Sequence, residues 1–264
     1  MTKIVVCIKQ VPDTHEVKID PKTNTLIRSG VPSIINPDDL SALELALQLK
    51  DAHGAEVIVL SMGPAQAEYA LRQALSLGAD HAILLSSREF AGADTWATSL
   101  TLATALKKIG GYSLILCGRQ AIDGDTAQVG PGIAEHLDIP QATYVKGISS
   151  FTADSVLVER QLENSQEHLQ VQLPAVLTVL KEAAEARLGT MRGIWDAFND
   201  GVLEIWDEKT LDLTQTPIGL NGSPTKVIET FSPPPKSGRM MIEGANAAEK
   251  VDNLLAVLQS KHIV

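Results

Sequence analysis

The residues best placed to do chemistry form the stretch "GRQAIDGDTAQVG", residues 118–130, which directly follows the apolar run "YSLILC". A buried strand ending at Gly118 places the following loop at the carboxyl edge of a parallel sheet, where α/β proteins bind ligands. Pro131 is tolerated only in the first turn of a helix, so a helix should begin between Asp125 and Gly130. Its first N–H groups have no partner within the helix, and its N-terminal end is electropositive. They could therefore hold a phosphate or pyrophosphate without a basic side chain.

Small and acidic residues in the same region refine this interpretation. Gly124, Gly130 and Gly132 should leave the backbone open to close approach by a ligand. Asp123 and Asp125 would repel a phosphate unless one of them caps the helix and the other accepts a hydrogen bond from a ribose hydroxyl. The alternative is that "DGD" is only a turn and a helix cap. The stretch alone leaves ligand binding and this simpler interpretation open.

Three further loops should lie at the same edge of the sheet. They are "KQVPD" after the first strand, "NPDD" before the first helix and "SMGPAQ" after the second strand. The last of these again places Gly and Pro at a helix start. The glycine fingerprints of dinucleotide-binding dehydrogenases and of P-loop NTPases are absent from the sequence, which disfavours both classes.

The pattern of residues gives no support to catalysis by side chains. The six histidines are scattered at predicted turns and helix ends, and the chain has no G-x-S-x-G or H-E-x-x-H motif. Its two cysteines, Cys7 and Cys117, lie in apolar runs and are expected to be buried, unpaired and free of metal. We therefore predict no catalytic residue and no metal site. A cofactor would have to carry any chemistry.

Composition narrows the class of protein further. Hydrophobic residues make up 44% of the 264 residues and aromatics only 4%, which favours layered α/β packing. The net charge of -10 disfavours non-specific binding to nucleic acid or to anionic membranes. The N-terminal apolar stretch is too short for a signal peptide, and no run reaches the roughly 18 apolar residues of a membrane helix. We expect a cytoplasmic protein without membrane insertion.

The elements that must position the loop alternate along the first two thirds of the chain. Strand-like runs cover residues 3–9, 56–63, 81–87 and 112–118, and helical patterns cover residues 38–54, 65–79 and 94–111, with a further helix ending near 135–140. This spacing predicts an α/β fold with a doubly wound, mostly parallel sheet and right-handed crossovers. The first helix should be capped by Asp38 or Asp39 and should bury a single apolar face. A β-hairpin outside the main sheet is predicted for residues 16–30.

The pattern changes at about residue 141. Alternating strands are predicted at 142–149, 155–162 and 166–173, the last two as a hairpin, followed by a buried strand at 174–180. Beyond Glu182 the periodicity is lost until a helical pattern at 246–261. More than thirty residues with little regular structure would be unusual inside a compact domain. We therefore expect a nucleotide-binding domain at 1–182 and a C-terminal arm and helix at 183–264 that pack on a partner subunit.

Seven motifs resemble, in their order along almost the whole chain, those of the β (small) subunit of electron-transfer flavoproteins. They are "VVCIKQVPD", "INPDDLSALELAL", "SMGPAQAEYALRQALSLGAD", "GRQAIDGDTAQVGPGIAEHLDIPQAT", "LPAVLTV", "ARLGTMRGI" and "GSPTKV". The resemblance implies an adenine-nucleotide α-hydrolase-like fold and a heterodimer with an α subunit that holds the redox FAD. It also implies electron transfer to or from an acyl-CoA dehydrogenase.

The resemblance also implies what the crevice binds. Small subunits of this family bind AMP there, and members that bifurcate electrons from NADH bind a second FAD instead. The segment "GDTAQVGP" is similar to that of bacterial relatives, which favours FAD over AMP and NAD as a possible electron donor. Matching the motif residue by residue gives the following expected contacts: Cys7 through its backbone, Asn36, Pro37, Asp38, Asp39, Met62, Gly118, Arg119, Gln120, Ala121, Ile122, Asp123, Gly124, Asp125, Thr126, Ala127, Gln128 and Val129.

The segment "RLGTMRGI" resembles the loop with which the family docks on acyl-CoA dehydrogenases. The expected docking residues are Thr190, Met191, Arg192 and Gly193. Met191 would enter an apolar pocket of the partner at the position where the family commonly has leucine, and the alternative is that it packs under its own arm. A second class of function stays open, a stand-alone adenine-nucleotide-binding module of the universal-stress type. Such a compact module would have no use for the long arm.

Overall fold

We describe the protein from a computed structural model, which covers residues 2–13, 32–199, 202–229 and 239–264. The chain forms two compact units, Met1–Ile228 and Glu229–Val264, and each is described by itself. The hairpin predicted at residues 16–30 lies outside the described residues.

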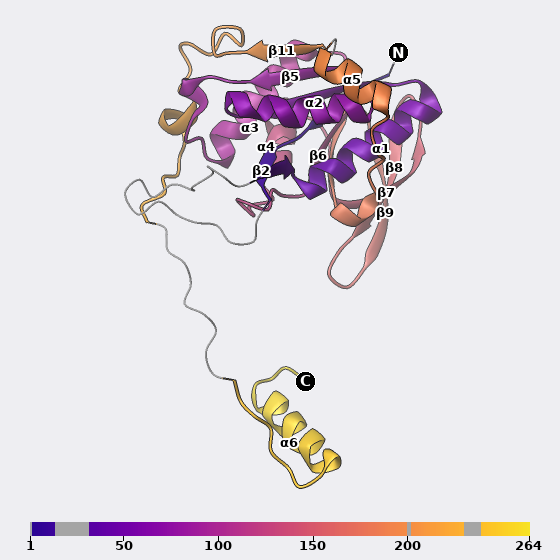
Figure 1. Ribbon diagram of the computed structural model, residues 1–264, viewed down its shortest axis with the longest axis vertical. Helices are drawn as coiled ribbons and strands as arrows, with labels where there is room; N and C mark the ends of the chain where they lie inside the picture. The colour runs from indigo at the N-terminus through magenta and orange to yellow at the C-terminus, as the bar shows by residue number, and fades with distance from the viewer. Residues whose placement is uncertain (1, 14–31, 200–201, 230–238) are drawn as a thin grey trace. The chain divides into compact units, whose positions relative to one another are not determined.

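The first unit is built on a nine-stranded sheet (Figure 1), with strand order β11-β5-β4-β1-β6-β10-β7-β8-β9. The parallel part consists of β11 (Leu203–Trp206), β5 (His81–Leu85), β4 (Glu56–Met62), β1 (Lys3–Cys7), β6 (Leu114–Gly118), β10 (Ala175–Val179) and β7 (Gln141–Phe151). Strands β8 (Ser155–Gln161) and β9 (Gln166–Gln172) continue from β7 as an antiparallel meander. Two short strands, β2 (Gln10–Pro12) and β3 (Ser33–Ile35), pair separately. The predicted doubly wound, mostly parallel sheet is confirmed.

Helices cover both faces of this sheet (Figure 1). One face packs on α1 (Pro37–His53), α2 (Glu68–Leu77) and α5 (Met191–Asn199), and the other on α3 (Thr95–Ile109) and α4 (Val129–Leu137). In the described residues, 3-10 turns lie at Ala65–Ala67, Arg88–Phe90, Lys181–Ala183 and Gly219–Gly222. Because side chains alternate along a strand, Ile4 and Val6 face the first helix layer while Val5 and Cys7 face the second.

Helix α1 is more deeply buried than its sequence predicts. It buries polar Ser41 and Glu44 as well as its leucines, because the segment at residues 181–187 covers its outer side. The prediction that Asp38 or Asp39 caps this helix is wrong. The N-cap residue is Asn36, followed by proline at the first helical position, and both aspartates lie inside the first turn.

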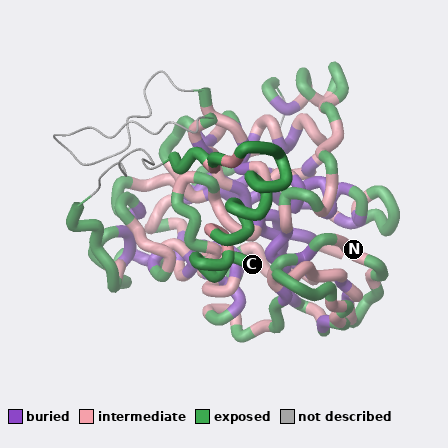
Figure 2. The backbone as a smooth tube through the Cα atoms, turned by 90° about the horizontal axis from the view of Figure 1, so that it is seen from below, coloured by how far each residue is buried: buried purple, intermediate pink, exposed green. Residues whose placement is uncertain are grey.

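The C-terminal third holds more regular structure than expected. Helix α5 and strand β11 lie within the predicted arm, and β11 adds a parallel strand beside β5. Trp206, Leu211 and Leu213 beyond it are buried in the second core layer. The first unit therefore extends to Ile228, past the predicted boundary at 182. The buried residues of this unit, coloured purple in Figure 2, include those of the central strands and of the inner sides of α1, α2 and α3.

The second unit contains the helix predicted near residues 246–261. Helix α6 (Ala247–Ser260) begins at Asn246, whose side chain accepts a hydrogen bond from the backbone N–H of Glu249. None of its residues is buried, and Val251, Leu254 and Leu255 are exposed. An amphipathic helix with an uncovered apolar side needs a partner surface to contribute to stability.

Candidate functional site

The candidate site lies where the order of the parallel strands reverses, a position that we call the switch point. From β1 the chain proceeds outward through β4 to β5, then returns to place β6 on the other side of β1. Beyond the carboxyl ends of β1 and β6 the two connections diverge, and this geometry leaves a crevice suited to a ligand. The two connections here are Lys9 with the residues after it and the segment 118–129. We call residues 118–129 the cofactor loop.

The side chain of Asp39 connects the ends of β1 and β6 at the switch point. Its carboxylate accepts a hydrogen bond from the backbone N–H of Lys9 at 2.8 Å and another from that of Gly118 at 2.9 Å. Burial of the carboxyl group raises its pKa to about 7, although these hydrogen bonds act in the opposite direction. Asp39 therefore holds β1, α1 and β6 in register, and its side chain is occupied by the protein itself.

Asn36 performs a similar task for the cofactor loop. Its side-chain N–H donates to the carbonyl oxygen of Gln120 at 2.8 Å, and its side-chain oxygen accepts from the N–H of Ile122 at 3.1 Å. Its own backbone N–H donates to the carbonyl of Lys9 at 2.9 Å. The side chain is fully buried and makes no capping bond to α1. Asn36 thus fixes the first half of the loop.

The two acidic residues of "DGD" are held by neighbouring side chains. Asp123 forms an ion pair with the ammonium group of Lys9 at 2.7 Å, and Asp125 accepts a hydrogen bond from the side chain of Gln120. Helix α4 has Gln128 as its N-cap residue, with no side-chain capping bond. The prediction that one of the two aspartates caps this helix is therefore wrong, because both point to other partners.

The second half of the cofactor loop offers unengaged backbone amides. Within the described part of the chain, no protein acceptor takes a hydrogen bond from the N–H groups of residues 126–130. Asp125 and Ala127 adopt left-handed backbone conformations, with φ of 53° and 54°, and Gln128 is right-handed. Alternation of this kind forms concave anion-binding surfaces. As predicted, helix α4 begins between Asp125 and Gly130, at Val129.

The glycines near the loop divide into two groups. A Cβ atom on Gly124 would meet no heavy atom within 4 Å, so this backbone is open to a ligand. A Cβ on Gly130 would clash with Cγ2 of Thr178, and one on Gly132 would lie 2.7 Å from the hydroxyl oxygen of Ser99. The predicted reason for the last two is therefore wrong. They allow α4 to pack closely on β10 and α3, rather than leaving space for a ligand.

The remaining predicted contacts lie at the carboxyl ends of β1, β4 and β6 or in the first turn of α1. Arg119 forms an ion pair with Asp38 at 3.5 Å, and burial raises the pKa of this aspartate. The two atoms of this ion pair, Oδ2 of Asp38 and Nε of Arg119, are buried and make no hydrogen bond with the described residues. Met62 and Lys9 line a small cavity of about 40 Å³. Cys7 is buried and unpaired, as predicted, and burial raises the pKa of its thiol to about 12.

The predicted docking segment lies elsewhere on the first unit, at the start of α5. Met191 is 86% exposed, so it does not pack under the described residues of the first unit. The hydroxyl of Thr190 accepts a hydrogen bond from the N–H of Gly193 at 2.9 Å, and Arg192 pairs with Asp196 at 3.3 Å. These local contacts shape the turn that presents Met191.

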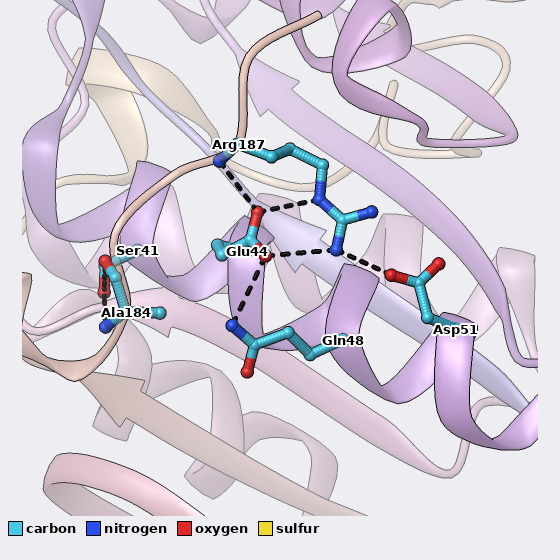
Figure 3. A network of polar contacts seen from close by, with 6 residues as sticks. All are labelled: Ser41, Glu44, Gln48, Asp51, Ala184 and Arg187. Carbon is cyan, nitrogen blue, oxygen red and sulfur yellow. Dashed lines mark hydrogen bonds and ion pairs between the residues drawn. The ribbon is translucent and has the colours of Figure 1, made fainter.

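Arg187 anchors the chain just ahead of this segment (Figure 3). Its guanidinium donates to both carboxylate oxygens of Glu44, at 2.9 and 3.0 Å, and to Asp51 at 2.8 Å. Three residues earlier, Ala184 exchanges two hydrogen bonds with the hydroxyl of Ser41. Sequence reasoning missed this latch, since residues 143 positions apart carry no local signal. It also missed Lys9, although the quoted loop "KQVPD" contains it.

No helix within the described ranges is both long and apolar enough to cross a membrane. No group of three or more His, Cys, Asp or Glu side chains in the same residues could hold a metal ion.

Comparison with known proteins identifies the family. Residues 23–198 match the family described as "Electron transfer flavoprotein domain". The chain is 52% identical to the caffeyl-CoA reductase-Etf complex subunit CarD of Acetobacterium woodii over 263 residues, 99% of this chain and 100% of the relative. It is 51% identical to the electron transfer flavoprotein subunit beta of Thermoanaerobacterium thermosaccharolyticum over 261 residues, 99% of each chain.

A third relative carries a different name. The acryloyl-CoA reductase electron transfer subunit gamma of Anaerotignum propionicum is 45% identical over 271 aligned positions, 99% of this chain and 100% of the relative. Identities of this size over whole chains, together with the family match, leave the relationship in no doubt. The chain belongs to the electron transfer flavoprotein family, as a protein of the β-subunit type.

Proposed function

We propose that this chain is the small subunit of a heterodimeric electron-transfer flavoprotein and binds an adenine cofactor at the switch point. The observation that carries the proposal is the row of unengaged amides at residues 126–130, placed at the start of α4. They would hold the phosphates without basic side chains. Asn36 and Asp39 would orient the loop rather than contact the cofactor, since their polar atoms already bind backbone groups.

We further propose that the cofactor is FAD rather than AMP, and that the complex takes electrons from NADH and bifurcates them. Support comes from the likeness of the loop sequence to bacterial members, and from a relative named as part of a caffeyl-CoA reductase-Etf complex. A bound flavin would supply the one- and two-electron chemistry, for which the chain's own side chains are unsuited. This chain would bind and orient it.

Cofactor content tests this proposal. The chain should be produced together with its α subunit, and the purified complex analysed for flavin and adenine nucleotide. We expect two FAD per heterodimer, and reduction by NADH of both a high-potential and a low-potential acceptor. One FAD with one AMP would refute bifurcation but preserve the carrier function. A stable monomer that binds ATP, with neither flavin nor partner, would instead favour the universal-stress type of module.

The contact with the α subunit is proposed to involve the second unit. Helix α6 exposes Val251, Leu254 and Leu255, and Met240 and Met241 ahead of it are exposed as well. An apolar strip of this kind is stable in water only when another surface covers it. An α subunit that receives this helix would account for its composition.

Met191 is proposed to dock on an acyl-CoA dehydrogenase or a similar flavoenzyme. Met191→Asp should slow electron transfer to that enzyme at least tenfold, because a carboxylate would be forced into an apolar pocket. Flavin content should stay unchanged, since the residue lies outside the cofactor site. Met191→Leu is the matched control and should retain the rate. Steady-state transfer rates measure both, and an unchanged rate for the aspartate variant would exclude this docking role.

A further inference from the structure

We propose that Arg72 is a positioning residue that holds helix α5 in the orientation in which it docks on the partner flavoenzyme. This inference rests on the proposed docking role of Met191 and adds the group that fixes the helix on which Met191 lies. Arg72 belongs to α2, outside the docking segment at residues 190–193 that the family motif indicates.

The apolar side of α5 faces outward. Met191, Ile194, Trp195 and Phe198 are all exposed, and their spacing places them on one face of the helix. The buried residue of α5 is Ala197, whose side chain is a single methyl group. A helix of nine residues is unstable in water on its own. Polar contacts and close backbone packing must therefore hold α5 on the first unit.

The start of α5 packs directly on the last turn of α2. A Cβ atom on Gly193 would lie 2.8 Å from the carbonyl oxygen of Ser76, and one on Gly189 would lie 3.1 Å from the same oxygen. Glycine at these two positions therefore allows the two backbones to approach closely. The hydroxyl of Thr190 accepts a hydrogen bond from the N–H of Gly193 and fixes the first turn.

Arg72 holds the other end of α5. Its Nη1 donates to the carbonyl oxygen of Ala197 at 2.7 Å, and its Nε donates to Oε1 of Glu68 at 2.7 Å. Carbonyl groups in the last turn of a helix lack partners within the helix, and a cation is favourable there. The guanidinium carbon lies 6.0 Å from the centre of the Phe198 ring, which also contacts the ring of Tyr69. One planar group thus fixes both the main chain of α5 and an aromatic side chain of its apolar face.

A helix held at both ends presents its apolar side chains in one arrangement. A partner that binds them does not have to order them first, which lowers the free-energy cost of association. Without Arg72 the end of α5 would fray, and Trp195 and Phe198 would lose their fixed positions relative to Met191. The cofactor loop should not be affected, because α4 packs on the opposite face of the sheet from α2 and α5.

The test separates docking from the electron-transfer step. The full complex, purified with its α subunit and reduced with a stoichiometric amount of dithionite, is mixed rapidly with increasing concentrations of an oxidised short-chain acyl-CoA dehydrogenase. Arg72→Met should raise the half-saturating concentration of the dehydrogenase roughly fivefold, as expected when one or two side chains must be ordered on binding. The limiting rate should stay within about twofold, because the interaction lost is one of binding alone.

Two control variants and one conservative variant accompany it. Glu68→Gln keeps an oxygen that can accept from Arg72 and should change the half-saturating concentration by less than about twofold. Arg160→Met removes an arginine that pairs with Glu167 in the β8–β9 meander, and docking should be unchanged. Arg72→Lys retains the positive charge and one donor for the carbonyl of Ala197, so its half-saturating concentration should lie between those of the wild type and Arg72→Met.

Hydrogen–deuterium exchange measures the order of α5 without the partner. The amides of α5 should exchange faster in Arg72→Met, whereas those of α4 should exchange at the wild-type rate. Unchanged exchange in α5, or faster exchange with an unchanged half-saturating concentration, would overturn the positioning role. An equal rise in Arg160→Met would show a general loss of stability instead. A wild-type complex that reduces a small dye but not the dehydrogenase would refute the proposed docking itself.

Discussion

Gly130→Ala should lower the free energy of unfolding by about 2–3 kcal/mol, the usual cost of overpacking a close contact, and should abolish cofactor binding. The new methyl group would clash with Cγ2 of Thr178 and lie 3.3 Å from the sulfur of Cys117. Neither β6 nor β10 can retreat, because both are central strands of the sheet. Helix α4 would have to move outward instead, and the amides ahead of it would move too. Thermal unfolding and nucleotide titration measure the two effects.

A second substitution can reverse this damage. Thr178→Ser removes the clashing methyl group and keeps the hydroxyl that accepts a hydrogen bond from the N–H of Tyr144 at 3.3 Å. Gly130→Ala/Thr178→Ser should therefore regain part of the lost stability and affinity. Gly124→Ala is the control within the same loop and should unfold at the wild-type temperature, since its Cβ would meet no atom. If Gly130→Ala matched Gly124→Ala in stability, the packing argument would be wrong.

Arg187→Met should have the largest effect on stability, a loss of about 3–4 kcal/mol in the free energy of unfolding. The variant leaves the buried carboxylate of Glu44 without its bidentate partner. It also releases the segment that runs from Arg187 to the docking residue Met191, so electron transfer to the dehydrogenase should fall with it. Chemical denaturation of the full chain provides the measurement.

The control for this variant comes from the same network (Figure 3). Asp51→Asn removes the exposed partner of Arg187 and should cost less than about 1 kcal/mol, because exposed pairs contribute little. The pH dependence of the free energy of unfolding provides a further test of this pair. Burial raises the pKa of Glu44, but the hydrogen bonds from Arg187 outweigh it and lower the pKa below 4.5. The stabilisation of the fold by the Arg187–Glu44 pair is therefore complete above pH 4.5 and is lost as the pH falls through the folded-state pKa of Glu44. When the free energy of unfolding is plotted against pH, the values for the wild type and for Arg187→Met should converge in acid.

Local patterns predicted the elements of the first 180 residues well, because alternating apolar runs and helix signals are short-range information. The start of α4 could be placed from Pro131 alone. The role of Gly130 could not, since its neighbour Thr178 is 48 positions away in the sequence and meets it only after β10 enters the sheet. Similarly, capping rules favour Asp38 or Asp39 at the start of α1. Tertiary contacts with Lys9 and Gly118 draw Asp39 into the first turn instead.

In the C-terminal third, the short elements α5 and β11 could not be predicted from the sequence. Helix α5 has nine residues, of which only Ala197 is buried, and β11 has four. Elements this short carry little periodic signal. They form because α2 and the free edge of β5 are already in place. The helix α6 could be predicted, since fourteen residues with an apolar strip and an asparagine cap suffice. No sequence pattern indicates where it docks.

The order of strands around β10 has a consequence for biosynthesis. Strands β7, β8 and β9 leave the ribosome before β10, yet β10 lies between β6 and β7 in the finished sheet. The nascent meander therefore has no native neighbour until residues 175–179 follow it, and the edge of β6 stays unpaired for the same interval. Exposed edges of this kind attract incorrect pairing. A cell that makes this protein has to protect the edge of β6 and the meander at residues 141–172 until one five-residue strand arrives.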